Sequence, residues 1–280
     1  MSIEFFNPTT LKQALKLKAR HKSGVAVVAG GTDFMVALKL GQPPPAAVMD
    51  ITKIKELRKI EAQGSSLFVG ACATFTDILE SGEVKERAPL LAAVAREIGA
   101  RQIRNRATIG GNVASGSPAG DSQPALWVLN ASVVMGGRRG ERSVRMRKFY
   151  TGYRQSVLED DEIILGFSIA RPRGDYVSEF FKVGARRAQA ISKISLACMA
   201  AIKGRVFEDV RLAAGSVAPV VTGLTETQKY LKGKRIRKNV IEKARRLAMG
   251  EVTPIDDVRS TALYRRTVTG NLVARFLGGL

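Results

Sequence analysis

Apolar and polar residues along the N-terminal part of the chain follow a pattern that predicts a small α/β unit. The apolar run at 25–29 is typical of a buried strand, and a second strand is expected at 46–51. Leucines and alanines near helical spacing predict a helix at 11–19, and a short helix is expected at 34–38. The predicted order is therefore helix, strand, helix, strand.

The part of the chain that follows this unit is longer, and it ends in a segment of proline and glycine residues whose last member is Gly174. Within it, apolar spacing predicts a hairpin at 57–70 and an amphipathic helix at 89–98. After Gly174 a run of strands is followed by a run of helices, which favours an α+β domain. We therefore predict two domains at 1–174 and 175–280, the first divided into subdomains at about 1–55 and 56–174.

The segment Ala107–Asp121 contains four glycines and a terminal carboxylate. Glycine lets a backbone approach another group closely because no Cβ intervenes, and a turn of successive N–H groups favours an anion such as phosphate. Asp121 suits a sugar or polyol hydroxyl, but it also begins a predicted helix at 121–130, where a carboxylate has a purely structural use. A tight turn between two strands explains the segment equally well.

A second glycine-rich segment follows the strand predicted at 25–29. Gly30 and Gly31 interrupt the apolar run, and Thr32 or Asp33 can cap the short helix that follows. This arrangement is similar to the phosphate-binding turn of dinucleotide folds. It lacks the G-x-G-x-x-G pattern and a P-loop lysine, so we predict neither a Rossmann nor a Walker site. Two such segments in one chain favour an anion cradle.

Histidine and cysteine usage excludes several classes of enzyme. His21 is the one histidine and lies in a polar run, so a Ser-His-Asp or Cys-His site is not expected. Cys72 and Cys198 lie far apart, which argues against a disulfide scaffold, a zinc site or an iron–sulfur cluster held by this chain alone. The sequence has no apolar run of bilayer length and no signal-peptide layout at its N-terminus, so we expect a cytoplasmic protein.

The formal charge of +20 raises nucleic acid as a partner. However, the basic residues are spread over many segments, and aromatic residues make up 6% of the chain, so a stacking platform for single strands is not evident. We therefore favour solvated faces, or docking on an acidic partner subunit, over nucleic-acid binding. The basic connector Arg101, Arg104 and Arg106 directly precedes the glycine-rich segment and is the first candidate for docking.

Several motifs in a fixed order resemble one known family. Ala29-Gly-Gly-Thr-Asp33 is followed by Thr108-Ile-Gly-Gly-Asn112 and then by Ser117-Pro-Ala-Gly-Asp121. Phe181-Lys182 and Arg186-Arg187 follow at matching places. Over essentially the whole chain, this order is similar to the FAD-binding medium subunit of the molybdenum hydroxylases, a family that includes the carbon monoxide dehydrogenase medium subunit and the xanthine dehydrogenase FAD-binding subunit. Ile98 departs from animal members, which have an aromatic residue there.

The resemblance implies a fold, a cofactor and a set of binding residues. The expected fold is α+β: a two-part FAD-binding domain of the vanillyl-alcohol-oxidase (PCMH) type, followed by a C-terminal α/β domain. Ile164 or Leu165 would lie near the isoalloxazine ring of FAD and Lys182 near its polar edge, while no catalytic side chain and no metal site is expected. The FAD-binding residues that the resemblance implies are Val27, Val28, Ala29, Gly30, Gly31, Thr32, Asp33, Phe34, Ile98, Ala107, Thr108, Gly111, Asn112, Ala114, Ser117, Gly120, Asp121, Ile164, Leu165 and Lys182.

The same resemblance implies that the chain transfers electrons within a larger enzyme. Electrons would leave a molybdenum centre on a large molybdopterin-binding subunit and pass through a small two-iron two-sulfur subunit to FAD. FAD would pass them to NAD, a quinone or oxygen, and the expected assembly is a dimer of heterotrimers. Two alternatives stay open: a standalone FAD-dependent reductase of related fold, and a basic nucleic-acid-binding protein.

Overall fold

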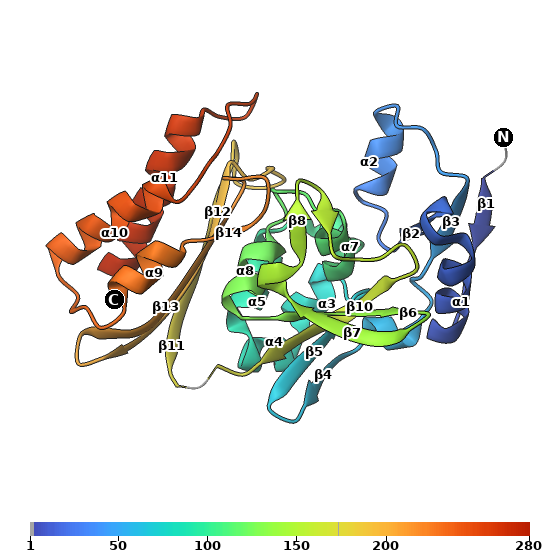
Figure 1. The fold of residues 1–280 in the computed structure, drawn as a ribbon, viewed down its shortest axis with the longest axis horizontal. Helices are drawn as coiled ribbons and strands as arrows, with labels where there is room; N and C mark the ends of the chain where they lie inside the picture. Colours follow the sequence, from blue (N-terminus) through green and yellow to red (C-terminus); the bar gives the residue numbers. More distant parts are fainter. Residues whose placement is uncertain (1–2, 173) are drawn as a thin grey trace.

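The N-terminal unit is a three-stranded parallel sheet with strand order β1-β3-β2. The computed structural model describes residues 3–172 and 174–280, and Figure 1 shows this unit at one end of the molecule. Thr10 caps α1, and Ala14 of that helix is buried with Val25 and Met49 in one apolar cluster. The elements of the unit are β1 (Glu4–Phe6), α1 (Leu11–His21), η1 (Lys22–Gly24), β2 (Val25–Val28), α2 (Phe34–Lys39) and β3 (Ala47–Asp50).

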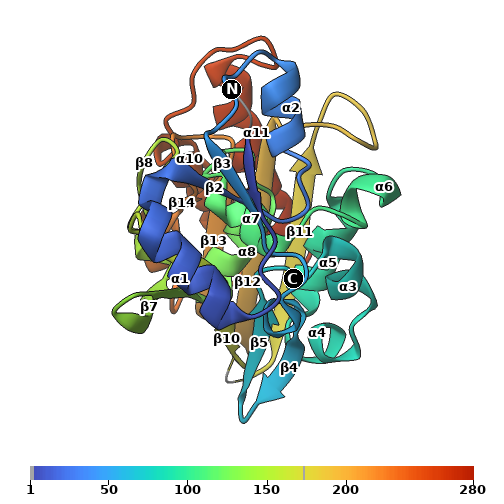
Figure 2. The same cartoon turned by 90° about the vertical axis from the view of Figure 1, so that its right-hand side faces the viewer.

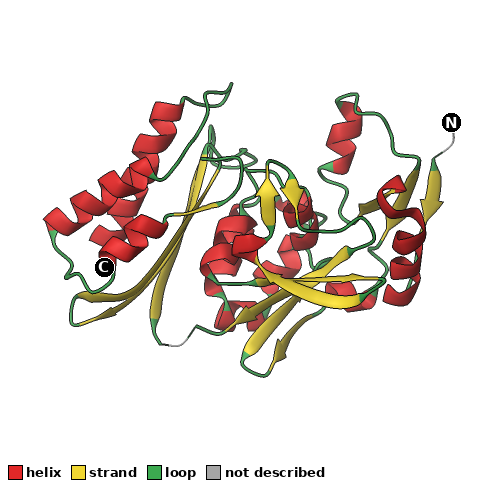
Figure 3. Ribbon diagram, in the orientation of Figure 1, coloured by secondary structure: helices red, strands yellow, loops and turns green. Residues whose placement is uncertain are grey.

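The middle unit is built on an antiparallel five-stranded sheet with strand order β4-β5-β10-β6-β7. A large apolar cluster fills the space between this sheet and the helices, which Figure 3 shows gathered beside it. The elements are η2 (Lys55–Arg58), β4 (Ile60–Gln63), β5 (Ser66–Gly70), α3 (Phe75–Glu80), α4 (Gly82–Arg87), α5 (Pro89–Glu97), α6 (Arg101–Arg104), α7 (Ile109–Ala114), α8 (Ser122–Val128), β6 (Ser132–Gly137), β7 (Gly140–Arg145), η3 (Met146–Lys148), β8 (Tyr150–Gly152), β9 (Gln155–Ser156) and β10 (Ile163–Ala170).

The C-terminal unit is a four-stranded antiparallel sheet that is covered on both faces. Leu196, Cys198 and Ala200 pack in one cluster with the C-terminal helices, whereas Ala197 and Met199 join the cluster of the middle unit. Figure 1 shows the helices on the outer face of this sheet and α5 and α8 on the inner side. The elements are β11 (Tyr176–Val183), β12 (Ile194–Lys203), β13 (Val206–Gly215), β14 (Thr222–Gly223), α9 (Thr225–Leu231), α10 (Lys238–Gly250) and α11 (Ala262–Gly278).

The α+β fold class is confirmed, and local structure differs from the sequence prediction in a few places. The predicted strand 57–61 of the hairpin begins at Ile60, because the preceding residues form the 3-10 turn η2. The glycine-rich segment is partly helical, because the Thr108 side chain caps α7 by accepting a hydrogen bond from the Gly111 N–H at 3.1 Å. Residues 206–215 form the single strand β13, on which the Asp209 carboxylate pairs with Arg211 at 2.8 Å.

Candidate functional site

The first glycine loop, which we define as residues 29–34, presents free backbone amides at the end of β2. Gly31 has φ of +73°, a left-handed conformation that glycine adopts without strain. Within the described residues, no protein acceptor is found for the N–H groups of Gly30, Gly31, Thr32, Asp33 and Phe34. A row of unpaired N–H groups creates positive potential, which suits an anion such as a pyrophosphate. This loop therefore has the free amides that the anion cradle predicted from the sequence requires.

In the second glycine segment, Ala107–Asp121, several backbone N–H groups already donate hydrogen bonds to the protein, unlike those of the first loop. The N–H of Ile109 donates to the Ala73 carbonyl at 3.1 Å, and that of Gly110 donates to the Ala71 carbonyl at 2.9 Å. The Gly111 N–H is taken by the Thr108 hydroxyl. The N–H groups of these three residues therefore anchor the segment to the protein itself and are not free for an anion.

Close packing of backbones explains why the two segments contain paired glycines. A Cβ placed on Gly30 would lie 1.9 Å from the Arg106 carbonyl oxygen, so the two segments touch through their main chains at this point. A Cβ on Gly110 would lie 2.6 Å from the carbonyl oxygen of Ala71. At Gly111, by contrast, an added Cβ would meet only the Thr108 hydroxyl, at 3.1 Å, and its remaining surroundings are open. Gly30 and Gly110 therefore serve packing, and Gly111 leaves room in the cavity beside it.

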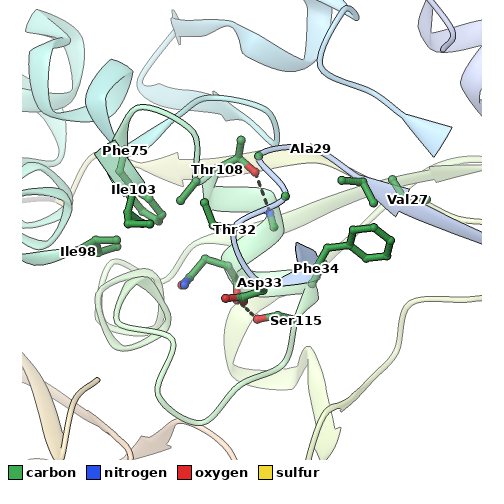
Figure 4. A pocket seen from close by; sticks show the side chains of 17 residues that line it. Val27, Ala29, Thr32, Asp33, Phe34, Phe75, Ile98, Ile103, Thr108 and Ser115 are labelled. Atoms are coloured by element: carbon green, nitrogen blue, oxygen red, sulfur yellow. Dashed lines mark hydrogen bonds between the residues drawn. The ribbon is translucent and has the colours of Figure 1, made fainter. Parts of the chain in front are cut away.

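A cavity of about 340 Å³, here called the narrow cavity, lies where the two segments meet. Figure 4 shows Phe75, Ile98 and Ile103 on one side of it and Val27 and Phe34 on the other. The narrow cavity continues into a wide cavity of about 810 Å³, because both are lined by Asp33, Phe34, Ile98, Ile103, Asn112 and Ser115. A third cavity, of about 290 Å³, shares Val27, Ala29, Gly111 and Ala114 with the narrow one. The three together form one continuous cleft.

The cleft brings together almost all of the residues that the resemblance implies. The wide cavity includes Ser117, Gly120, Asp121 and Lys182, and the third cavity includes Ile164. The narrow cavity includes Val27, Val28, Ala29, Gly30, Gly31, Thr32, Asp33, Phe34, Ile98, Ala107, Thr108, Gly111, Asn112 and Ala114.

Leu165 is the one residue of the set that the structure places elsewhere. Its side chain packs in the N-terminal apolar cluster and covers Gly136, whose added Cβ would lie 2.9 Å from Leu165 Cδ1. The pairing of β10 with β6 shifts between Ile164 and Gly166, so the bulge falls on Leu165. Ile164 therefore borders the third cavity and Leu165 borders none of the three, whereas Lys182 lines the wide cavity. The residues expected on either side of the flavin ring thus lie in different cavities.

A buried ion pair fixes the polar end of the wide cavity. Lys182 Nζ lies 2.8 Å from Asp121 Oδ2, and the two side chains are 9% and 8% exposed. Lys182 also donates to the Glu97 carbonyl at 2.8 Å, and Ser192 Oγ donates to Asp121 Oδ1 at 2.5 Å. Asp121 makes no side-chain hydrogen bond that caps α8. Its carboxylate therefore holds Lys182 in place, and the alternative of a helix-capping role is not supported.

Sequence reasoning missed several residues that line the cleft. Phe75 and Ile103 contribute apolar surface, and Arg154, Gln189 and Arg259 line the wide cavity. The sequence feature that points to Ile103 is its position between the arginines of the basic connector, which forms helix α6. For the other four residues the sequence contains no usable signal, because their contacts join elements that are distant along the chain.

Both cysteine side chains are buried, and burial keeps their thiols protonated and unsuited to redox reactions or metal binding. Burial raises the pKa of the Cys72 thiol to about 12, and it also raises the pKa of Cys198 well above its usual range. Within residues 3–172 and 174–280, no group of three His, Cys, Asp or Glu side chains is placed to hold a metal ion. In the same part of the chain, no helix is both long enough and apolar enough to cross a bilayer.

Comparisons with known proteins identify the family. Residues 1–172 match a family described as the FAD binding domain in molybdopterin dehydrogenase, and residues 179–280 match the CO dehydrogenase flavoprotein C-terminal domain. The nicotinate dehydrogenase FAD-subunit of Eubacterium barkeri is 37% identical over 68% of this chain and 66% of that protein. The carbon monoxide dehydrogenase medium chain of Hydrogenophaga pseudoflava is 31% identical over 98% of this chain and 95% of that protein.

The comparison of folds identifies the same family. A carbon monoxide dehydrogenase structure from Hydrogenophaga pseudoflava superposes with a TM-score of 0.94 at 28% identity, covering 98% of this chain and 96% of that one. The match spans both the cleft-bearing region and the C-terminal unit. The chain therefore belongs to the FAD-binding subunits of the molybdopterin dehydrogenases, and FAD is its cofactor.

Proposed function

We propose that this chain holds FAD in the cleft and carries electrons from an iron–sulfur partner subunit to an external acceptor. The observation that supports the proposal most is the first glycine loop: five of its N–H groups find no acceptor among the described residues, and its residues line a cavity together with the second segment. When bound, FAD supplies the redox chemistry, accepting electrons from the partner and passing them to NAD, a quinone or oxygen. The residues of this chain bind and orient the cofactor.

The pyrophosphate fits the first glycine loop. Its two negative charges need several donors, and Gly30 to Phe34 offer successive N–H groups without rearrangement of the protein. The open space at Gly111 lets the cofactor approach the second segment closely. We propose Val27, Ala29 and Ala114 as neighbours of the remaining nucleotide, because they continue the cleft into the third cavity.

The wide cavity fits the flavin ring. Ile98 and Ile103 offer apolar surface, and Lys182 lies at the polar end of the cavity, where it donates to the carbonyl of Glu97, the residue before Ile98. Asp121 and the Glu97 carbonyl hold Lys182 at one position, so its charge is fixed before the cofactor binds. Because Asp121 neutralises the charge of Lys182, the pair would act on a flavin through the remaining N–H donor of Lys182, and a fixed donor of this kind favours the more negative, reduced state. We therefore propose that Lys182 tunes the potential of the bound flavin.

Partner docking is proposed for the exposed arginines beside the cleft. Arg104 donates to the carbonyls of Arg96 and Ile98, so it supports the cleft wall rather than a partner. Arg101 and Arg106 are exposed and, within the described residues, have no ion pair. Figure 2 shows α6 protruding at one side of the molecule. We propose this surface for the small iron–sulfur subunit, with the large molybdopterin subunit bound through it; a dimer of such heterotrimers stays a prediction.

We also propose a domain boundary at residue 174, which falls between the segments that match the two families.

The test of the proposed function uses the complex of this chain with the subunits that purify with it. After anaerobic reduction of the iron–sulfur subunit with dithionite and removal of the excess, mixing with the FAD-loaded chain should bleach the visible flavin absorbance as the iron–sulfur absorbance recovers. A flavin that stays oxidised beside a reduced partner would contradict the electron-transfer role.

A further inference from the structure

A separate pocket of about 520 Å³, here called the arginine pocket, lies beside the wide cavity. Segments from three parts of the chain meet there: Ser117–Ala119, the β8–β9 turn with Tyr153 and Arg154, and the C-terminal residues Ser216, Asp257–Arg259 and Arg265. It shares Ser117, Ala119, Arg154 and Arg259 with the wide cavity, so the two are neighbours. None of the residues of the first glycine loop lines it.

The arginine pocket carries more positive than negative charge. Arg154, Arg259 and Arg265 line it, and the only carboxylate among its lining residues is Asp257. Arg265 holds Asp257 Oδ1 at 2.6 Å, and the Arg259 N–H donates to the same oxygen at 2.8 Å. Burial alone would raise the pKa of Asp257, but these hydrogen bonds hold it below its ordinary value. Asp257 therefore neutralises one of the three cations, and two positive charges remain.

Two buried polar atoms in the pocket have no hydrogen-bond partner among the residues that the structure describes. Arg265 is 4% exposed, and its terminal nitrogens bind Asp257 and the Ser216 carbonyl, but no acceptor is found for its Nε. The Ser216 hydroxyl is likewise buried and unpartnered. Burying such groups costs about 1–3 kcal/mol each when they stay unsatisfied. Buried groups of this kind call for a partner that the protein itself does not supply, such as a ligand, an ion or a water molecule.

The backbone at the pocket is strained at two positions. Ser216 has φ of +62° and Arg154 has φ of +54°, although neither is glycine. Such conformations cost about 1–3 kcal/mol each and cluster at ligand sites. Arg154 is exposed, and its guanidinium lies 5.9 Å from the centroid of the Tyr153 ring but, within the described residues, makes no hydrogen bond or ion pair. Its guanidinium is therefore available to a ligand.

We propose that the arginine pocket binds an anion bearing a carboxylate or a phosphate group, next to bound FAD and distinct from it. Arg154 offers a planar pair of donors that matches either group, while the Ser216 hydroxyl and Arg265 Nε are unpartnered donors of residues that line the same pocket. The place of the pocket beside the wide cavity suits an anionic small molecule that approaches the flavin end of the cleft.

The test measures anion binding to the FAD-loaded chain by isothermal titration calorimetry at constant ionic strength. Inorganic phosphate and citrate serve as the two probes, and their relative affinity distinguishes a phosphate from a carboxylate ligand. We expect saturable binding of at least one probe, weakened at least tenfold in Arg154→Gln and in Ser216→Ala. Arg205→Gln is the matched control, since Arg205 is also an exposed arginine with positive φ in a hairpin turn, and it should bind the probes within twofold of the unchanged chain.

Three outcomes would overturn the proposal. Binding only to the FAD-free chain would assign the anion to the pyrophosphate loop. Equal weakening in Arg154→Gln and Arg205→Gln would show general charge attraction. The absence of saturable binding by both probes would leave the two buried atoms to an internal water and exclude an anion site.

Discussion

A methyl group added at Gly111 should interfere with FAD and leave the protein almost untouched. An added Cβ there meets the Thr108 hydroxyl at 3.1 Å and otherwise projects into the narrow cavity. At the neighbouring Gly110 it would lie 2.6 Å from both the Cβ and the carbonyl oxygen of Ala71. Gly111→Ala and Gly110→Ala are therefore a matched pair, with the same chemical change in the same helix directed at different targets.

The magnitudes follow from these surroundings. Gly111 lies in the first turn of α7, so alanine gains less there than the roughly 1 kcal/mol of a helix interior, and the added Cβ presses on the capping Thr108 hydroxyl. These opposing effects should keep the stability of the FAD-free chain within about 1 kcal/mol of that of the unchanged chain. Forcing an extra methyl group against a packed cofactor costs about 1–3 kcal/mol. The dissociation constant of FAD should then rise roughly 5- to 150-fold. Gly110→Ala should behave oppositely, losing about 1–3 kcal/mol of folding stability by overpacking.

The assay combines two measurements on deflavinated protein. Quenching of FAD fluorescence gives the affinity of each variant, and urea unfolding of the FAD-free chain gives its stability. An unchanged FAD affinity in Gly111→Ala would refute the argument. So would equal losses of affinity and stability in both variants, because that result would mean that the glycine pair acts through packing alone.

Three further predictions rest on other features. Asp121→Asn leaves Lys182 buried without its counter-ion and should lower the free energy of unfolding by about 3–5 kcal/mol. The double variant Asp121→Asn/Lys182→Met should recover part of this loss. A loss below about 1 kcal/mol in urea titrations would contradict a structural ion pair. Because burial raises the pKa of Cys72 above its unfolded value, this thiol stabilises the fold below pH 9 and that contribution is lost as the pH rises from 9 toward 12. Native protein at pH 8 should therefore not react with a thiol reagent that labels the unfolded chain, and rapid native labelling would show that the site opens. Arg101→Gln combined with Arg106→Gln should keep the FAD content and slow association with the iron–sulfur subunit, with a weaker salt dependence than the unchanged chain; identical rates across a salt series would exclude this docking surface.

The sequence predicts most local structure because apolar spacing and caps are local signals. Helix α5 and strand β5 lie where the pattern places them. The position of β10 between β5 and β6 does not follow from the pattern, because strand pairing joins residues distant along the chain. The helix in the second glycine segment is also hidden, since glycine normally disfavours helices and only the Thr108 cap reveals why one forms.

At the candidate site, too, the sequence predicts local features but not the contacts between residues that are distant along the chain. The motifs locate both glycine segments, but the sequence does not show that Gly30 packs on Arg106 rather than on the cofactor. The side of β10 that Leu165 faces depends on a bulge, which has no clear sequence signature here. The pairing of Lys182 with Asp121 depends on how the middle and C-terminal units pack together.

Amide hydrogen exchange, with and without FAD, tests the central claim most directly. In the FAD-free chain the N–H groups of Gly30 to Phe34 have no protein acceptor, so they should exchange rapidly. Saturation with FAD should slow exchange in this loop, whereas the N–H groups of Ile109 and Gly110, already bonded to Ala73 and Ala71, should be slow in both states. Stoichiometric FAD binding without any change in exchange at residues 30–34 would contradict the cradle on which this account rests.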